Sequence, residues 1–284
     1  MKIGVHPSNL HLRIASLLPG AFAALDGRFV SYPDGRQTAA LLAQGDIHLG
    51  GTGSTPPLQA EGEGHDVQYI AASAPRPANA AILVRRDGPV TELGRLAGAR
   101  VTLVDGSFHN YLLARALEEV GLTLRDVTIG ETPAAESLPA LIEGRVDAWI
   151  AMSPRLEAVE DHPDLRVLTR CGTRIPNRSL FWTLAGSGLS GDDRFALAEE
   201  LARIGTRIEA EKPDIAERLA RAPGSEGDAA TWAKVLAARD FSIHPADAAV
   251  LAEQREEADT LLRHGHFSAP VRTGEQKGNP GARA

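Results

Sequence analysis

Three polar side chains stand close together near the middle of the chain, and their types suit the binding of an anion. The stretch VTLVDGSFHNYLLARALEEVGL begins at Val101 with a short β-like run, and an amphipathic helical pattern starts directly after Gly106. Ser107, His109 and Asn110 therefore fall on the first turn of the expected helix. Free N–H groups and the positive end of the helix dipole meet at such a turn, which makes it a natural anion site.

Similar turns follow other expected strands. Each places a hydroxyl residue before a helical run, three of them directly before proline: Ser8, Thr55, Thr132 and Ser153. In open α/β sheets the carboxyl ends of the strands carry the ligand site. Several such turns together favour an anionic ligand, whereas ordinary helix capping explains any single one equally well.

Three histidines also follow expected strands. His6, His48 and His109 lie at separate strand ends, which an α/β fold would bring towards one cleft. A histidine can act as an acid, a base or a hydrogen-bond donor near neutral pH. The simpler interpretation is that each of them hydrogen-bonds a bound anion or the neighbouring backbone.

The elements that must position these residues alternate regularly. Strand patterns such as KIGV, VQYIAAS, RVTLV and DAWIAM are separated by helical patterns of one to four turns, which indicates βαβ units. From about residue 190 onward only helical patterns occur. The predicted fold class is α/β, with two mixed, mostly parallel sheets and a helical C-terminal segment. Residues 269–284 are polar and rich in Gly and Pro, and we expect a flexible tail there.

Composition limits the possible functions. The 284-residue chain has a net charge of −7, which argues against a general nucleic-acid binder. Cys171 is the single cysteine, so neither a disulfide framework nor a cysteine metal cluster is expected, and we predict no metal or other cofactor. No apolar run has the length of a membrane span. No signal-peptide pattern precedes the first strand, so the chain as given is expected in the cytoplasm, or in the periplasm or at the cell surface if it is a trimmed form.

The motifs resemble a known family. The stretches GDIHLGGTGSTPPLQAEGEG, VTLVDGSFHN and ALIEGRVDAWIAMSP are similar to segments of solute-binding proteins from the aliphatic sulfonate, taurine and nitrate group of ABC transporters. The resemblance covers roughly residues 2–188. It implies the type II solute-binding fold, with lobe one at 1–82 plus 187–268 and lobe two at 83–186, and a ligand in the cleft between them.

The same resemblance implies which residues hold the ligand. Thr52, Gly53, Ser107, His109 and Asn110 match the positions that bind sulfonate oxygens in this family. Ser153 is added because it follows the DAW segment, where this chain departs from the family pattern. The expected partners are a small organic anion and, if the chain is exported, a transporter permease. We expect a monomer.

A second resemblance leaves an enzyme open. Aromatic sulfinate desulfinases have the same fold, and their catalytic Cys–Pro corresponds here to His6–Pro7, while their Arg–x–Gly–Gly corresponds to the stretch from His48 to Gly51. Because neither the cysteine nor the arginine is present, a standard desulfinase mechanism is not supported. The alternative hypothesis is therefore an enzyme acting on a small organosulfur or related anionic metabolite, with His6 or His48 as acid–base.

Overall fold

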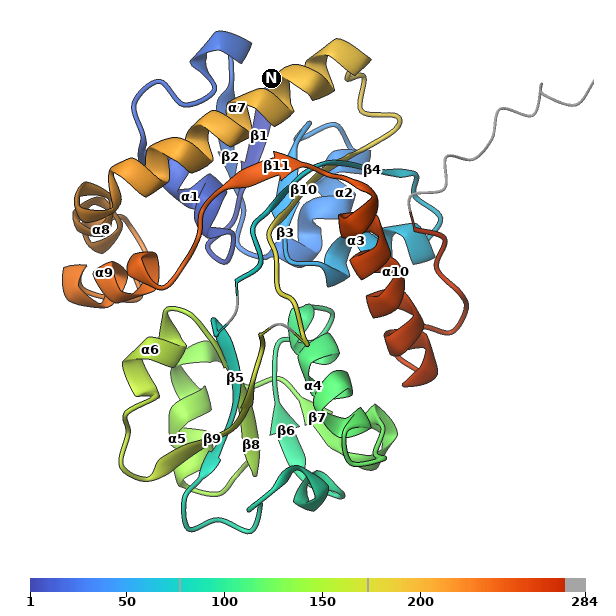
Figure 1. The fold of residues 1–284 in the computed structure, drawn as a ribbon, viewed down its shortest axis with the longest axis vertical. Coiled ribbons are helices and arrows are strands. Elements are labelled where there is room, and N and C mark those ends of the chain that lie inside the picture. Colours follow the sequence, from blue (N-terminus) through green and yellow to red (C-terminus); the bar gives the residue numbers. More distant parts are fainter. Residues whose placement is uncertain (77, 173, 274–284) are drawn as a thin grey trace, which may run out of the picture.

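The chain forms two α/β lobes, one above the other in the view of Figure 1. The computed structural model describes residues 1–76, 78–172 and 174–273. Most of the tail expected at 269–284 therefore lies outside the described residues. The upper lobe contains the N-terminal strands and the C-terminal helices, and the lower lobe contains the middle of the sequence.

The first lobe has two sheets. Strands β1 and β2 pair in parallel, and a second sheet has the order β11-β4-β10-β3 with antiparallel pairing throughout. The strands are β1 (Lys2–Val5), β2 (Arg28–Ser31), β3 (Gly50–Thr52), β4 (Val67–Ser73), β10 (Leu180–Leu184) and β11 (Ile243–Pro245). The helices are α1 (Leu10–Leu17), α2 (Thr38–Ala43), α3 (Thr55–Gly62), α7 (Gly191–Ala210), α8 (Lys212–Arg221), α9 (Ala229–Ala237) and α10 (Ala248–Arg263).

The second lobe has one sheet of the order β7-β6-β8-β5-β9. Strand β6 runs parallel to β7 and β8, and β5 runs antiparallel to β8 and β9. The strands are β5 (Ala80–Arg85), β6 (Arg100–Thr102), β7 (Thr128–Gly130), β8 (Ala148–Met152) and β9 (Leu165–Arg170). The helices are α4 (Phe108–Glu118), α5 (Ser137–Ile142) and α6 (Arg155–Val159).

The mixed α/β architecture agrees with the predicted fold class, but parallel pairing is less dominant than expected. Strands β5 and β10 enter their lobes from the other lobe, so each runs against its neighbours. These two strands lie close to the expected lobe boundaries. All of β5 pairs within the second sheet, and β10 pairs with β3 and β4 in the first lobe. The chain therefore passes from the first lobe to the second after β4 and returns before β10.

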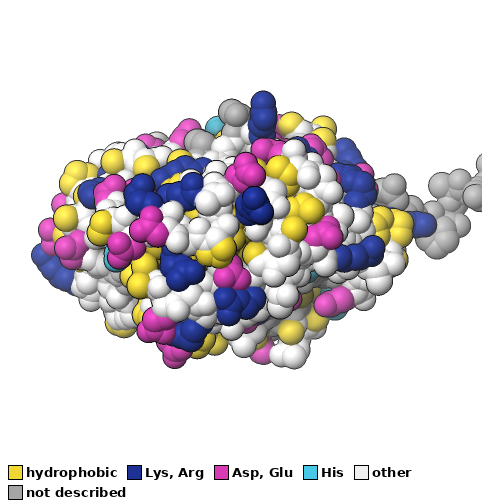
Figure 2. Space-filling view, turned by 90° about the horizontal axis from the view of Figure 1, so that it is seen from below, with side chains coloured by type: hydrophobic (Ala, Val, Ile, Leu, Met, Phe, Trp, Pro, Cys, Tyr) yellow, Lys and Arg dark blue, Asp and Glu magenta, His cyan; other side chains and the backbone are white. Residues whose placement is uncertain are grey.

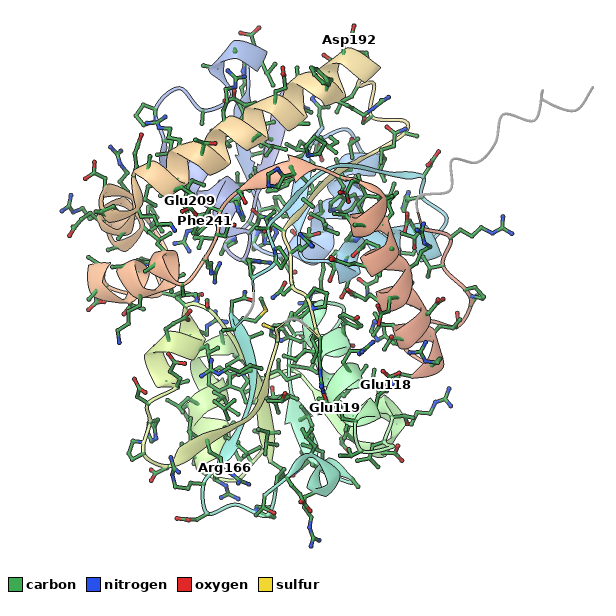
Figure 3. The ribbon with its side chains drawn as sticks, in the orientation of Figure 1. Glu118, Glu119, Arg166, Asp192, Glu209 and Phe241 are labelled. Carbon is green, nitrogen blue, oxygen red and sulfur yellow. The ribbon has the colours of Figure 1, made fainter. Side chains whose placement is uncertain are left out.

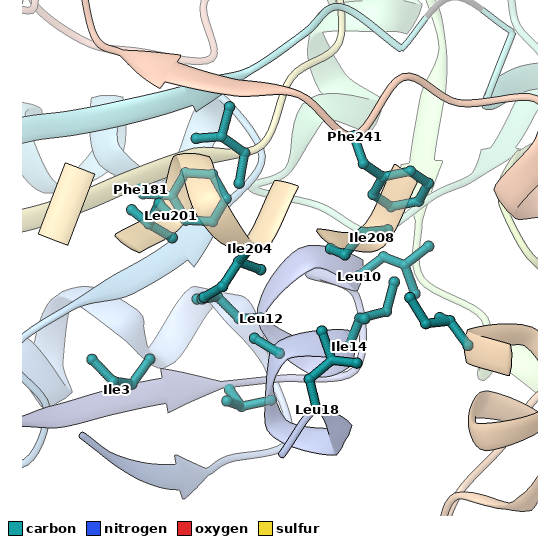
Figure 4. Close-up of a cluster of buried hydrophobic side chains, with 14 of the residues drawn as sticks. Ile3, Leu10, Leu12, Ile14, Leu18, Phe181, Leu201, Ile204, Ile208 and Phe241 are labelled. Atoms are coloured by element: carbon teal, nitrogen blue, oxygen red, sulfur yellow. The ribbon is translucent and has the colours of Figure 1, made fainter. Parts of the chain in front are cut away.

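The core of the first lobe is built mainly between α1 and the apolar face of the 20-residue helix α7. Helix α7 begins at Ser190, which caps it together with Asp193. Its inward face carries Leu197, Leu201, Ile204 and Ile208 at spacings of three and four residues. These side chains pack against apolar residues of α1 and strand β1 (Figure 4). The result is a helix layer that fixes α1 at the lower edge of the lobe.

Helix α10 joins the two lobes. Val250, near its start, belongs to an apolar cluster of the first lobe, whereas Leu261, near its end, belongs to the core of the second lobe. The end of α10 lies beside α4, where Glu118 accepts a hydrogen bond from Arg263 at 2.8 Å (Figure 3). His264 continues this contact by accepting the Leu124 N–H at 3.2 Å. The lobes are thus packed together on this side of the molecule.

Candidate functional site: a cleft lined by arginines

A cleft between the lobes is the main candidate site. It is lined from the first lobe by the β1–α1 turn and α1, and from the second lobe by the segments that follow β6, β7 and β8. These segments lie at the carboxyl ends of their strands, where the sequence placed the ligand site. The cavity volume is about 140 Å³. One water molecule needs roughly 10–15 Å³ of such cavity volume, so the cleft suits a ligand of about ten non-hydrogen atoms.

Arg13 enters the cleft from α1. This helix buries residues on all sides, including His11 and Arg13 among leucines and isoleucine. The Arg13 guanidinium donates to the Gly224 carbonyl at 3.3 Å and lies 5.4 Å from the centre of the Trp232 ring. Burial lowers the pKa of Arg13 from its usual value. A buried cation in an apolar helix is costly unless an anion compensates it, so this position favours an anion site.

Arg76 and Arg239 form the floor of the same cleft. Arg76 lies in the first crossing segment and donates to Asn177 Oδ1 at 3.0 Å, while its Nε has no acceptor. The Nε of Arg239, which follows α9, also has none. Burial and the charge of Arg239 lower the pKa of Arg76 to about 9, and burial lowers the pKa of Arg239 to about 10. Both groups are cationic at neutral pH, and nothing in the described part of the chain forms a salt bridge with either.

Apart from Arg155, the wall contributed by the second lobe is neutral and polar. His109 accepts the Val104 N–H through Nδ1 at 3.0 Å, and burial lowers its pKa to about 4, so it is uncharged at neutral pH. Ser153 donates a hydrogen bond to Glu157. Trp149 adds apolar surface. The charge of the cleft is therefore concentrated on the side of the first lobe.

One ion pair connects the lobes across the cleft. Arg155 at the start of α6 binds Glu226 of the first lobe at 2.6 Å, and about a third of each side chain is exposed. Helices α6 and α9 also lie in contact at this side of the cleft. Glu226 also attracts Arg13 through its charge, whereas Arg76 and Arg239 form no salt bridge with any described residue.

The structure brings two of the predicted ligand residues, His109 and Ser153, into the cleft wall. Four others do not line it. Thr52 accepts from the Trp182 indole at 3.0 Å and donates to the carbonyl of Gly53, which lies beside Phe108. A ligand role for Thr52 and Gly53 remains a prediction.

Ser107 and Asn110 form the cap of α4. Ser107 Oγ accepts the His109 N–H at 3.2 Å and donates to the Val104 carbonyl at 2.6 Å. Asn110 completes a capping box and donates to Asp105 at 2.7 Å. Their polar atoms are thus engaged within the protein, although a ligand role for them stays a prediction as well.

The two histidines proposed for catalysis do not meet in the cleft. His6 is buried, and its Nε2 is 2.8 Å from the Gly51 carbonyl. Burial lowers the pKa of His6. His48 accepts the Lys2 N–H at 3.0 Å at the start of β1, whereas His6 follows the end of that strand. Neither side chain lines the cleft, so the geometry gives no support to histidine acid–base chemistry there.

Sequence reasoning missed the three buried arginines. They come from separate places: the middle of α1, a Pro-flanked crossing segment, and the end of α9. The sequence feature that could have indicated a buried charge is Arg13, which interrupts the apolar run of LHLRIASL. Arg76 and Arg239 become informative only once both lobe crossings are known. Across 1–76, 78–172 and 174–273 there is no group of three or more metal-ligating side chains, and no helix in these ranges could span a membrane.

This fold and cleft define the class of periplasmic binding proteins. A family model described as NMT1/THI5 like matches residues 23–171, just over half of the chain, and the chain belongs to this family. The chain is 30% identical over 188 residues to the putative aliphatic sulfonates-binding protein of Escherichia coli K12, a match covering 65% of this chain and 59% of that relative. The aligned region therefore spans less than two thirds of that relative.

Solved structures agree over nearly the whole chain. The periplasmic aliphatic sulphonate binding protein SsuA of Escherichia coli matches with a TM-score of 0.83 and 26% identity, covering 95% of this chain and 94% of that one. The alkanesulfonate-binding protein SsuA of Xanthomonas axonopodis pv. citri bound to MOPS has a TM-score of 0.81 at 26% identity, with 95% of each chain covered. These matches confirm the resemblance that the sequence motifs indicated.

Proposed function

We propose that this chain is the substrate-binding protein of an ABC importer and that its ligand is a small organic anion of the sulfonate type. The observation that carries the proposal is the set of buried arginines in the cleft, Arg13, Arg76 and Arg239. Guanidinium groups bind planar or tetrahedral oxyanions through charge-assisted hydrogen bonds. The names of the relatives, which bind aliphatic sulfonates, support this class of ligand.

The proposal includes a partner and a location. A binding protein of this kind delivers its ligand to a membrane permease, and we propose a monomer that does so. The relatives described as periplasmic support the periplasm as the working compartment over the cytoplasm. The enzyme alternative required His6 or His48 at the ligand, and no contact in the structure favours it.

Calorimetry with a simple alkanesulfonate tests the proposal. Ethanesulfonate is expected to bind the purified protein at one equivalent, whereas ethanol, which lacks the anionic group, is expected not to bind. Replacing Arg76→Gln should weaken ethanesulfonate binding by about 2–4 kcal/mol, because a buried charge-assisted contact is lost. The matched control is Arg95→Gln, since Arg95 is exposed on the second lobe outside the cleft. No heat from ethanesulfonate or from any other sulfonate would refute the proposed ligand class.

A further inference from the structure

The cleft contains more positive charge than one monovalent anion can compensate. Four guanidinium groups lie in its wall, those of Arg13, Arg76, Arg155 and Arg239. Within the described residues the facing carboxylates are Glu226, which pairs with Arg155, and Glu157, which attracts Arg239. His109 is neutral at physiological pH. Two positive charges therefore remain without a partner.

The uncompensated arginines have different surroundings within the cleft. Arg76 and Arg239 are close enough to repel each other, as the lowered pKa of Arg76 indicates, and they form one cationic centre. Arg13 lies against Trp232 and the Gly224 carbonyl, and its nearest charged influence is Glu226. A ligand with a single acid group brings one negative charge to these two positive charges. The other would stay charged and buried, which is unfavourable.

We infer that the ligand is a small organic dianion, with one acid group held by Arg76 and Arg239 and a second acid group facing Arg13. This inference rests on the proposed function and narrows its substrate class from sulfonates in general to acids that carry a second ionised group, such as a carboxylate. The cavity volume of about 140 Å³ admits a two- or three-carbon chain between the two groups. Trp149 and Trp232 supply apolar surface for that chain.

The test compares two ligands of similar size on the wild-type protein. Sulfoacetate carries a sulfonate and a carboxylate, and ethanesulfonate carries the sulfonate alone. By calorimetry at one pH and one ionic strength, sulfoacetate should bind at least about tenfold more tightly, since each added contact to a charged group contributes about that factor or more. Its affinity should also fall more steeply with added salt.

The outcomes separate this inference from the proposed function. If ethanesulfonate binds as tightly as sulfoacetate, the dianion assignment is overturned while a sulfonate-binding function stands. If neither compound binds, and longer alkanesulfonates also fail, the proposed function itself is wrong.

A pair of variants tests the two-centre arrangement. Arg13→Gln should reduce sulfoacetate affinity about tenfold more than it reduces ethanesulfonate affinity, because the second acid group is the one that faces Arg13. Arg95→Gln serves as the exposed control and should change neither affinity. Equal losses for both ligands in Arg13→Gln would contradict the assignment of a separate second centre. The comparison of ligands on the wild-type protein remains decisive if the Arg13 variant does not fold.

Discussion

At the scale of single residues, the buried arginines of the cleft bind the ligand but lower the stability of the ligand-free protein. Arg76 and Arg239 lie side by side with unpartnered Nε groups, and each would be more stable in water. Proteins retain such groups where a ligand completes them, since buried charges without partners cost several kcal/mol. The ligand-free protein should therefore gain stability when one of these charges is removed.

The substitution Arg76→Met tests whether the charge of Arg76 lowers the stability of the ligand-free protein. We expect the free energy of unfolding of the ligand-free protein to rise by about 1–2 kcal/mol, because an apolar side chain of similar length removes the repulsion with Arg239. Sulfonate binding should fall in the same variant. Denaturant unfolding measures the first effect and calorimetry the second. A loss of stability in Arg76→Met would mean that its hydrogen bond to Asn177 outweighs the repulsion.

His109 should make stability depend on pH. Its pKa is lowered to about 4 in the folded protein, against an ordinary value of 6.5. The folded state therefore binds this proton less readily than the unfolded chain does. The contribution is fully present above pH 6.5 and is lost as the pH falls towards 4, by about 3 kcal/mol in total.

The variant His109→Gln removes this titration and keeps a side-chain oxygen that can accept the Val104 N–H. Its unfolding free energy should change less between pH 6.5 and 4 than that of the wild type, as measured by urea unfolding at several pH values. Burial also lowers the pKa values of His6 and His11, so part of the pH dependence should remain. Identical pH profiles for both proteins would show that His109 is not the source.

At the scale of elements, the first turn of α4 has a structural role next to the proposed ligand site. Ser107 and Asn110 hold the first turn, and this places His109 in the cleft wall. A cap residue and a ligand residue have the same chemical type, because both offer hydroxyl or amide groups to N–H donors or oxyanions. The contacts of the folded chain are needed to tell them apart.

Ser107→Ala separates the two roles. If capping is its role, the unfolding free energy should fall by about 1 kcal/mol and sulfonate affinity should stay within a factor of two or three. Thermal or urea unfolding and calorimetry on the same sample provide both numbers. A large loss of affinity with little loss of stability would restore the ligand role that the sequence motif suggested.

At the scale of the whole molecule, α10 determines how the lobes are joined. Its two ends belong to different lobes, and further ion pairs cross between them, including Arg115–Glu256 and Arg36–Glu131. Charges of both signs are interspersed over the face of the second lobe shown in Figure 2, with no cationic patch dominating it. The apolar contact of α10 positions the two walls of the cleft.

The substitution Leu261→Ala tests whether α10 joins the two lobes. Leu261 is fully buried in the core of the second lobe, so its truncation should lower the unfolding free energy by about 2–5 kcal/mol. Hydrogen exchange should accelerate in α4 of the second lobe, against which the end of α10 packs. The matched control is Leu58→Ala in α3, equally buried but within the first lobe. Equal protection of α4 in the Leu261 variant and the wild type would contradict a joint at α10.

The two-lobed α/β fold could be predicted because the strand and helix patterns alternate along the chain, and the family motifs agree with them. The lobe boundaries are harder to predict from the sequence, because β5 and β10 are apolar strands. Their sequences do not show which sheet they join. The arginine centre could not be assembled from local patterns. Its members are far apart in sequence and meet only through the two crossings, whereas His109 and Ser153 each follow a recognisable strand end.

The two chain crossings have a consequence for biosynthesis. The second lobe is one continuous stretch between the crossings, but the first lobe is assembled from segments on either side of it. During translation the second lobe can therefore be completed while the sheet of the first lobe still lacks β10 and β11. The apolar faces of the N-terminal strands stay exposed until α7 has been synthesised. Chaperone capture of nascent chains is expected to concentrate in that interval.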